Sequence, residues 1–252
     1  MIVDCNCTLG PWPFRRLRHS DATGLLELMD VYGVTQAWVG AVEGIFYRDM
    51  AAANEQLLER IAGYESRLVP WAVINPAFPG WEDDLQEAEA SGFVGVRLYP
   101  NYHAYDLADP RLADLLGAIK ALHWPVAIYA KVQDERLHHW HTLVPPVDFT
   151  PLPQLVERFP DLPLLTYGQT QQFAQQYAGL FAGSNLHLDI SRCEGVAAVA
   201  DMVQAIGADH VLFGSHAPLF YLEAAVLKVQ EAGLEGTARE AILHANATRL
   251  LG

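Results

Sequence analysis

Residues 69–74, with the sequence VPWAVI, and residues 125–130, PVAIYA, are two short apolar runs that contain no charged side chain. Each has about the length of a β-strand, and neither alternates between polar and apolar residues as a strand with one face in water does. Strands that are buried on both faces have this pattern, and they occur in parallel sheets covered by helices. The two runs therefore predict an α/β protein built on a buried parallel sheet.

Strand-like and helix-like segments alternate along the whole chain. Eight strand-like runs are found, at residues 1–7, 35–42, 68–75, 93–99, 125–131, 162–166, 186–190 and 210–213. Helical patterns lie between them at 21–32, 49–62, 81–90, 109–122, 151–159, 171–182, 196–206 and 219–232, and a last helix is expected at 237–250. This order predicts one domain over residues 1–252, a (β/α)8 TIM barrel with an extra C-terminal helix. An open doubly wound sheet is the alternative, although no G-x-G-x-x-G turn follows the first run.

The composition is that of a globular protein with a negative net charge. Of the 252 residues, 51% are hydrophobic and 18% are charged, which is enough for a large core. The net charge of −14 argues against partners such as nucleic acid or an anionic membrane. The first residues lack the basic and apolar pattern of a signal peptide, and no apolar run reaches the ~18 residues of a membrane span. We therefore expect a cytoplasmic protein, and the sequence is compatible with a homo-oligomer.

Four segments resemble a known family: residues 2–10 (IVDCNCTLG), 92–107 (GFVGVRLYPNYHAYDL), 210–218 (HVLFGSHAP) and 242–252 (ILHANATRLLG). They are similar to the amidohydrolase-related proteins, which are TIM-barrel metal-dependent hydrolases and decarboxylases. The resemblance implies a site at the carboxyl ends of the barrel strands. It also implies a hydrolase or, as the alternative, a decarboxylase-type lyase.

The resemblance also implies positions for metal ligands, and this chain departs from the family at each of them. The His-x-His that typically ends the first strand corresponds to Asn6 and Thr8, and the later His, His and Asp correspond to Tyr129, Thr166 and His216. Threonine and tyrosine bind zinc poorly compared with imidazole or carboxylate. We therefore predict a degenerate metal site, without the usual metal ligands and without a cofactor.

Two histidines that follow predicted strands are candidates for catalysis. His216 lies in Gly-Ser-His-Ala-Pro after the eighth strand, and His103 lies in Pro-Asn-Tyr-His after the fourth. Each could act as a general acid or base, and the alternative for each is a structural histidine bonded to a loop carbonyl. Water is the expected nucleophile, because Ser215 lacks the second glycine of a G-x-S-x-G elbow. Three further histidines are interpreted as a solvated loop or an interface: His138, His139 and His141.

Half of the 16 basic residues follow predicted strands, so the barrel mouth is expected to be positive within an acidic protein. They are Arg15, Arg16, Arg18, Arg48, Arg97, Lys131, Arg136 and Arg192. We predict that Arg97, Arg15 and Arg16 bind the anionic group of a small substrate, because arginine forms bidentate pairs with carboxylates. The alternative is ion pairing with nearby acidic residues. The remaining candidates for substrate binding are Asn101, Tyr102, Glu135 and Arg136.

The sequence leaves two other possibilities open. The first is a barrel that has lost the metal site and catalysis but still binds a small carboxylate. The second is a metal held by new ligands, such as His103 and His216.

Overall fold

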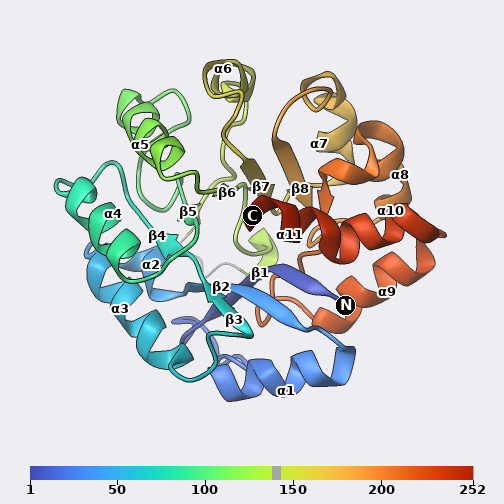
Figure 1. Ribbon diagram of the computed structural model, residues 1–252, viewed down its shortest axis with the longest axis horizontal. Coiled ribbons are helices and arrows are strands. Elements are labelled where there is room, and N and C mark those ends of the chain that lie inside the picture. The colour runs from blue at the N-terminus through green and yellow to red at the C-terminus, as the bar shows by residue number, and fades with distance from the viewer. Residues whose placement is uncertain (138–142, 252) are drawn as a thin grey trace.

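The computed structural model describes residues 1–137 and 143–251, and it confirms the predicted barrel (Figure 1). The strands are β1 (Val3–Leu9), β2 (Gln36–Ala41), β3 (Leu68–Pro70), β4 (Ala72–Val73), β5 (Val96–Leu98), β6 (Val126–Tyr129), β7 (Leu164–Tyr167), β8 (Leu186–Asp189) and β9 (Val211–Leu212). All neighbouring pairs are parallel and follow chain order. β3 and β4 are two parts of one barrel strand that is interrupted at Trp71, so the barrel has the eight strands expected.

The barrel closes between its first and last strands, which excludes the open-sheet alternative. The amide of Cys5 donates to the carbonyl of Phe213 at 2.9 Å, and the amide of Thr8 donates to the carbonyl of Ala217 at 2.9 Å. A parallel bridge joins Cys7 to Ala217. The residues after β9 therefore continue the last strand along β1.

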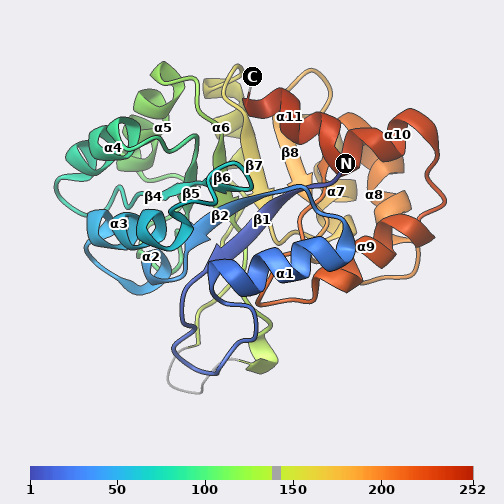
Figure 2. The ribbon, with the colours of Figure 1, turned by 60° about the horizontal axis from the view of Figure 1, so that its bottom comes forward.

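Helices surround the barrel, as the alternating pattern predicts (Figures 1 and 2). They are α1 (Ala22–Tyr32), α2 (Glu43–Phe46), α3 (Met50–Ile61), α4 (Trp81–Ala90), α5 (Pro110–Ala121), α6 (Leu152–Arg158), α7 (Gln171–Gln176), α8 (Ala198–Ile206), α9 (Leu222–Glu231), α10 (Gly236–Glu240) and α11 (Asn246–Leu251). α1 shows why such elements begin and end where they do. The Asp21 side chain caps its N-terminus by accepting from the amide of Gly24, and Gly33 ends it in the left-handed conformation.

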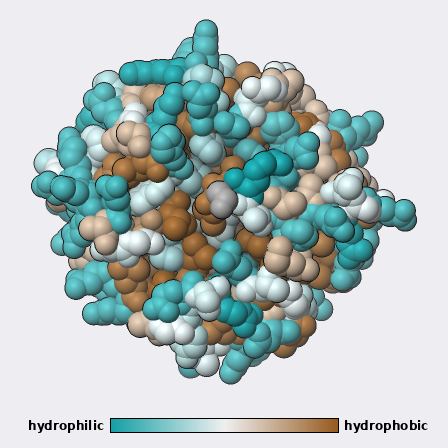
Figure 3. Space-filling model, in the orientation of Figure 1, coloured by the Kyte–Doolittle hydropathy of each residue, from teal (hydrophilic) through white to brown (hydrophobic). Residues whose placement is uncertain are grey.

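The expected C-terminal helix is present but is not one regular element. A π-helical turn, η4 (Ala241–Ala245), separates α10 from α11. Next to this turn the side chain of Asn246 donates to the carbonyls of Ala208 and Val211, which ties the chain to the start of β9. α11 then crosses the end of the barrel where the strands begin, and this end faces the viewer in Figures 1 and 3. None of the described helices has the length and apolar character needed to cross a membrane.

Candidate active site

A group of buried polar side chains lies inside the barrel toward the carboxyl ends of its strands, and Asn6 is at its centre. The Nδ2 of Asn6 donates to Oδ2 of Asp189 at 2.8 Å, and its Oδ1 accepts from the hydroxyl of Tyr129 at 2.5 Å. The same Oδ1 lies 3.3 Å from Nδ1 of His216. All four residues are at most 2% exposed. The network therefore connects β1, β6, β8 and the turn after β9 in the buried interior of the barrel.

His216 is held so that both of its ring nitrogens face oxygen atoms. Its backbone has the left-handed φ of 61°, and its amide donates to the carbonyl of Asn6 at 2.7 Å. Nε2 lies 2.5 Å from the carbonyl oxygen of Val132, and Nδ1 faces Asn6. Burial lowers the pKa of His216 to about 4, and the charges of Arg97 and Arg192 also lower it, whereas the bond to Val132 raises it. The ring is therefore neutral at pH 7 in the ligand-free protein.

Arg97 is buried inside the barrel, whereas the sequence predicted it to bind an anion at the barrel mouth. Its Nη1 donates to the carbonyl of Cys7 at 2.6 Å and to the hydroxyl of Tyr129 at 3.0 Å. Its Nη2 donates to the carbonyl of Trp38 at 2.7 Å, and no part of the residue is exposed. A side chain at Gly40 would come within 2.8 Å of its Cδ, so glycine leaves the space that Arg97 fills. A substrate that bound Arg97 would have to displace backbone carbonyls of the barrel.

Among the described residues, seven of the fifteen buried side-chain polar atoms without a hydrogen-bond partner lie at or just after these strand ends. The seven are Oγ1 of Thr8, the hydroxyl of Tyr99, Oε1 of Gln133, Oγ1 of Thr166, Nε2 of Gln169, Oγ of Ser191 and Nη1 of Arg192. Buried polar groups are normally paired, and each unpaired one costs free energy. These seven atoms give this end of the barrel polar groups that water or a polar ligand can pair.

Arg15 and Arg16 lie in the loop after β1, away from the buried position of Arg97. With Trp12, Arg18 and neighbouring residues of this loop they line a pocket of about 690 Å³. No hydrogen bond or ion pair joins these three arginines to a carboxylate of the described chain. Figure 2 shows this loop and the segment after β6 projecting together from one end of the barrel. The two arginines thus stand at the mouth, but they do not converge on Arg97 as the sequence suggested.

The candidates after β5 pack against α2 rather than against His216. His103 is buried, and its Nε2 bonds to the carbonyl of Gly44 at 2.9 Å. Burial lowers the pKa of His103 to about 4. Tyr102 packs edge-on against Phe46, and Asn101 donates to the carbonyl of Pro145. The contacts of His103 are those of the structural alternative, a histidine bonded to a loop carbonyl.

The segment after β6 contains the last of the predicted site residues. Glu135 and Arg136 lie in a short 3-10 helix, η1 (Glu135–Leu137). Arg136 pairs with Asp134 at 2.6 Å, and this hydrogen-bonded pairing lowers the pKa of Asp134. This contact corresponds to the alternative given from the sequence, in which the arginine pairs with a nearby acidic residue and does not bind substrate. The three histidines of the adjacent cluster lie outside the described residues: His138, His139 and His141.

The sequence analysis gave no role to Asp189 and counted Arg192 only among the basic residues of the mouth, whereas the structure connects both to His216 through Asn6 and Phe220. Burial raises the pKa of Asp189, while hydrogen bonds from Asn6 and from the amide of Gly168 lower it. Arg192 lies over the ring of Phe220 at 5.9 Å, and Phe220 packs edge-on against His216. A usable signal was present in the sequence, because Asp189 ends a buried strand and Arg192 follows three residues later.

The described side chains do not form a recognisable set of metal ligands. No group of three or more His, Cys, Asp or Glu residues in residues 1–137 and 143–251 is placed to hold a metal ion. The side chains of Asn6, Asp189 and His216 are engaged with one another, and the hydroxyls of Thr8 and Thr166 are weak ligands.

Comparison with known proteins shows which family model the chain matches and which solved structures it resembles. The amidohydrolase family model matches residues 3–252, and no curated protein matches. An uncharacterized TIM-barrel protein from Bordetella bronchiseptica has a similar solved structure, with a TM-score of 0.76 and 20% sequence identity over 99% of this chain and 98% of that chain. At this level of identity the likeness shows a shared fold.

Two further similar structures contradict the prediction that no cofactor is needed. A 5-carboxyvanillate decarboxylase from Novosphingobium aromaticivorans contains bound manganese; its TM-score is 0.71, with 15% identity over 90% of this chain and 80% of that chain. A dihydroxybenzoic acid decarboxylase from a Polaromonas species also contains manganese; its TM-score is 0.68, with 18% identity over 90% and 84% of the two chains. The prediction rested on residue types at ligand positions taken from a resemblance, and the manganese in these two structures overturns it. The family model spans the barrel from its first strand to its last helix, and the chain therefore belongs to the amidohydrolase family.

Proposed function

We propose that this protein is an enzyme that removes the carboxyl group from a small carboxylate at the barrel mouth, with His216 as the proton donor. The observation that carries the proposal is the placement of both ring nitrogens opposite oxygen acceptors, Val132 O at 2.5 Å and Asn6 Oδ1 at 3.3 Å. A neutral imidazole has one N–H, which can donate to Val132 while Oδ1 of Asn6 accepts from the hydroxyl of Tyr129. An imidazolium has two N–H groups and can donate to both oxygens, so the hydrogen-bonding geometry around His216 accepts the protonated ring as well as the neutral one.

Substrate binding would supply the condition for protonating His216. With a pKa of about 4 the ring is neutral in the ligand-free protein, and an adjacent carboxylate raises that pKa. Arg192 is the cation best placed to bind this carboxylate, because its charge acts on His216 and its Nη1 is buried without a partner in the described chain. The substrate would take the place of the Val132 carbonyl, which covers Nε2.

The chemical step needs one proton and no nucleophile. The bond between the substrate carbon and its carboxyl group breaks, the electron pair stays on that carbon, and carbon dioxide leaves. The proton on Nε2 of His216 is transferred to the carbon, and the ring becomes neutral again. Two of the similar solved structures are decarboxylases of aromatic acids, which supports this reaction type for the chain.

Hydrolysis is the second candidate, because the same histidine is neutral in the ligand-free site. A neutral His216 could accept a proton from water that attacks an ester, lactone or amide of a carboxylate-bearing molecule. The two reactions have opposite pH dependence. Decarboxylation requires protonated His216, so its rate falls as the pH rises, whereas hydrolysis requires the neutral ring, so kcat/KM rises as the pH increases through about 4.

The test is an activity screen of the full chain, both as purified and with added manganese. Carbon dioxide release is measured from hydroxylated aromatic and aliphatic carboxylates, and hydrolysis from esters, lactones and amides of the same acids. His216→Asn is the informative variant, because asparagine tolerates the left-handed φ of 61°. We expect it to lower kcat by about 100-fold or more. The control is His123→Asn, another histidine with a positive φ of 57°, which lies away from this site.

The outcomes separate the alternatives. Carbon dioxide release that depends on His216 supports the proposal, and hydrolysis that depends on it supports the second candidate. If binding of carboxylates is found without either reaction, the barrel is a ligand-binding protein and both enzymatic proposals fail.

A further inference from the structure

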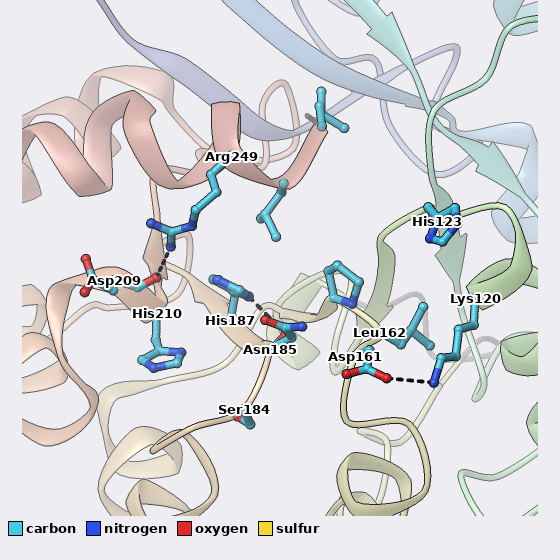
Figure 4. Close-up of a pocket in the computed structure, with 13 residues that line it drawn as sticks. Lys120, His123, Asp161, Leu162, Ser184, Asn185, His187, Asp209, His210 and Arg249 are labelled. Atoms are coloured by element: carbon cyan, nitrogen blue, oxygen red, sulfur yellow. Dashed lines mark hydrogen bonds and ion pairs between the residues drawn. The ribbon is translucent and has the colours of Figure 1, made fainter.

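A second polar pocket lies at the opposite end of the barrel, where the strands begin. It has a volume of about 650 Å³ and is bounded by the residues that precede β7, β8 and β9 and by the last turn of α11 (Figure 4). In Figure 3, which looks onto this end, hydrophobic groups show toward the middle and hydrophilic groups mainly around the rim. The proposed reaction at His216 makes no use of this pocket.

Two histidines in the pocket are fixed in one orientation by backbone carbonyls. Nδ1 of His187 lies 3.1 Å from the carbonyl of Asn185, and Nδ1 of His210 lies 2.7 Å from the carbonyl of Leu186. A carbonyl only accepts hydrogen bonds, so Nδ1 carries the hydrogen in both rings. The rings stand 5.6 Å apart, and neither Nε2 has a partner among the described residues.

His187 offers its Nε2 to the pocket as an acceptor. The residue is only 4% exposed, and its pKa is lowered to about 4 by burial, with smaller effects in the same direction from His210 and Arg249. At pH 7 it is therefore neutral, protonated at Nδ1 and unprotonated at Nε2. A ligand that donates a hydrogen bond to this nitrogen would complete its pairing.

Arg249 supplies a positive charge on the side of the pocket where His187 lies. Its Nη2 donates to the carbonyl of Asp209 and to Oδ1 of Asn246, both at 3.2 Å, and these acceptors are neutral. Figure 4 shows the Asp209 carboxylate directed away from this guanidinium. On the other side of the pocket, near His123, Lys120 is already paired with Asp161 at 3.0 Å. The positive charge of Arg249 is thus open to an anion.

From this combination we propose that the pocket binds a singly protonated phosphate group, with a P–OH donating to Nε2 of His187 and the P–O⁻ oxygens accepting from Arg249. The acceptor and the cation lie on one side of one cavity, and they match the two kinds of oxygen on such a group. Sulfate offers no hydroxyl near neutral pH, so it fulfils only the arginine contact. The pocket therefore distinguishes two anions of similar size and shape.

The test is calorimetric titration of the full chain with inorganic phosphate, methyl phosphate and sulfate at about pH 6, where inorganic phosphate and about half of the methyl phosphate carry a P–OH. We expect phosphate to bind about tenfold more tightly than sulfate, the scale of one hydrogen bond to a charged group. Methyl phosphate that binds as well as phosphate points to a phosphorylated metabolite as the ligand. Methyl phosphate that binds much more weakly points to free phosphate.

Two variants, each with a matched control, test whether phosphate binds in this pocket. His187→Asn keeps a donor near Asn185 but lacks Nε2, and Arg249→Gln removes the charge. Each is expected to weaken phosphate binding by about tenfold or more. His244→Asn and Arg239→Gln alter the same residue types outside the pocket and should leave binding unchanged. If a pocket variant fails to fold, nitrogen NMR of the wild-type imidazoles still tests the proposal, because phosphate should shift Nε2 of His187. Equal binding of phosphate and sulfate, no binding of phosphate at millimolar concentrations, or an unmoved Nε2 signal would overturn the proposal.

Discussion

The side-chain amide of Asn6 donates a hydrogen bond to Oδ2 of Asp189 at 2.8 Å and so joins residues 183 positions apart in the chain. Both side chains are completely buried. Oδ1 of the same carboxylate accepts from the amide of Gly168 at 2.9 Å. The contact therefore compensates part of the cost of burying an acidic group at the centre of the barrel.

Replacing Asn6 by alanine should destabilise the fold. Asp189 would lose one of its donors, and the hydroxyl of Tyr129 would lose its acceptor. We expect the free energy of unfolding in urea to fall by about 1–3 kcal/mol, the range for a buried polar group left without its partner. The control is Asn185→Ala, an exposed asparagine whose change should stay within about 0.5 kcal/mol. Equal effects of the two substitutions would show that the network contributes little.

Arg97→Met separates a structural role from an anion-binding role. The substitution keeps much of the volume but leaves the carbonyls of Cys7 and Trp38 without their donor. If the role is structural, the free energy of unfolding should fall by about 2–4 kcal/mol. Arg239→Met, at an exposed position of α10, should change it little. A variant of normal stability that has lost carboxylate binding would instead support the anion-binding role predicted from the sequence.

The arginines of the loop after β1 should act on substrate capture and not on stability. Arg15→Gln and Arg16→Gln remove charges that have no carboxylate partner among the described residues. We expect KM for an anionic substrate to rise several-fold in each variant, and the effect to shrink as salt screens the remaining charges. Steady-state kinetics at low and high ionic strength measures this. An unchanged KM at low salt, with Arg239→Gln as the reference, would contradict a role in capture.

Stability should decrease in mild acid because of the buried histidines. His103, His187 and His216 each have a pKa lowered to about 4, mainly by burial, from an ordinary value of 6.5. The unfolded chain therefore binds protons more readily than the folded one between these values, and the free energy of unfolding falls as the pH drops from 6.5 toward 4. Each group contributes at most about 3 kcal/mol.

Urea unfolding at a series of pH values measures this dependence. His216→Asn should have a shallower slope between pH 6.5 and 4 than the wild-type protein, because one of the three groups is removed. His123→Asn, at an exposed position, serves as the comparison. Identical slopes for the wild type and His216→Asn would show that His216 does not titrate in this range on unfolding.

The sequence by itself determined the elements and their order. Runs such as residues 125–130 predict buried strands because burial on both faces leaves no room for polar residues, and such a pattern can be read locally. Strand–helix alternation then predicts a parallel barrel, since parallel neighbours need a crossover connection. The long C-terminal helix was anticipated as one element, but the anchor at Asn246 and the π-helical turn beside it divide it.

Only the tertiary structure decided which polar groups meet. Arg97 was predicted at the mouth because it ends a buried strand, but its donors are taken up by carbonyls of β1 and β2, which the sequence does not place around it. Asp189 gained importance because barrel closure places Asn6 of β1 within hydrogen-bond distance of it, and Arg192 because Phe220 packs between it and His216. A side chain's place within a strand follows from a period of two residues, whereas its hydrogen-bond partners depend on where other strands, up to 183 residues away, present their atoms.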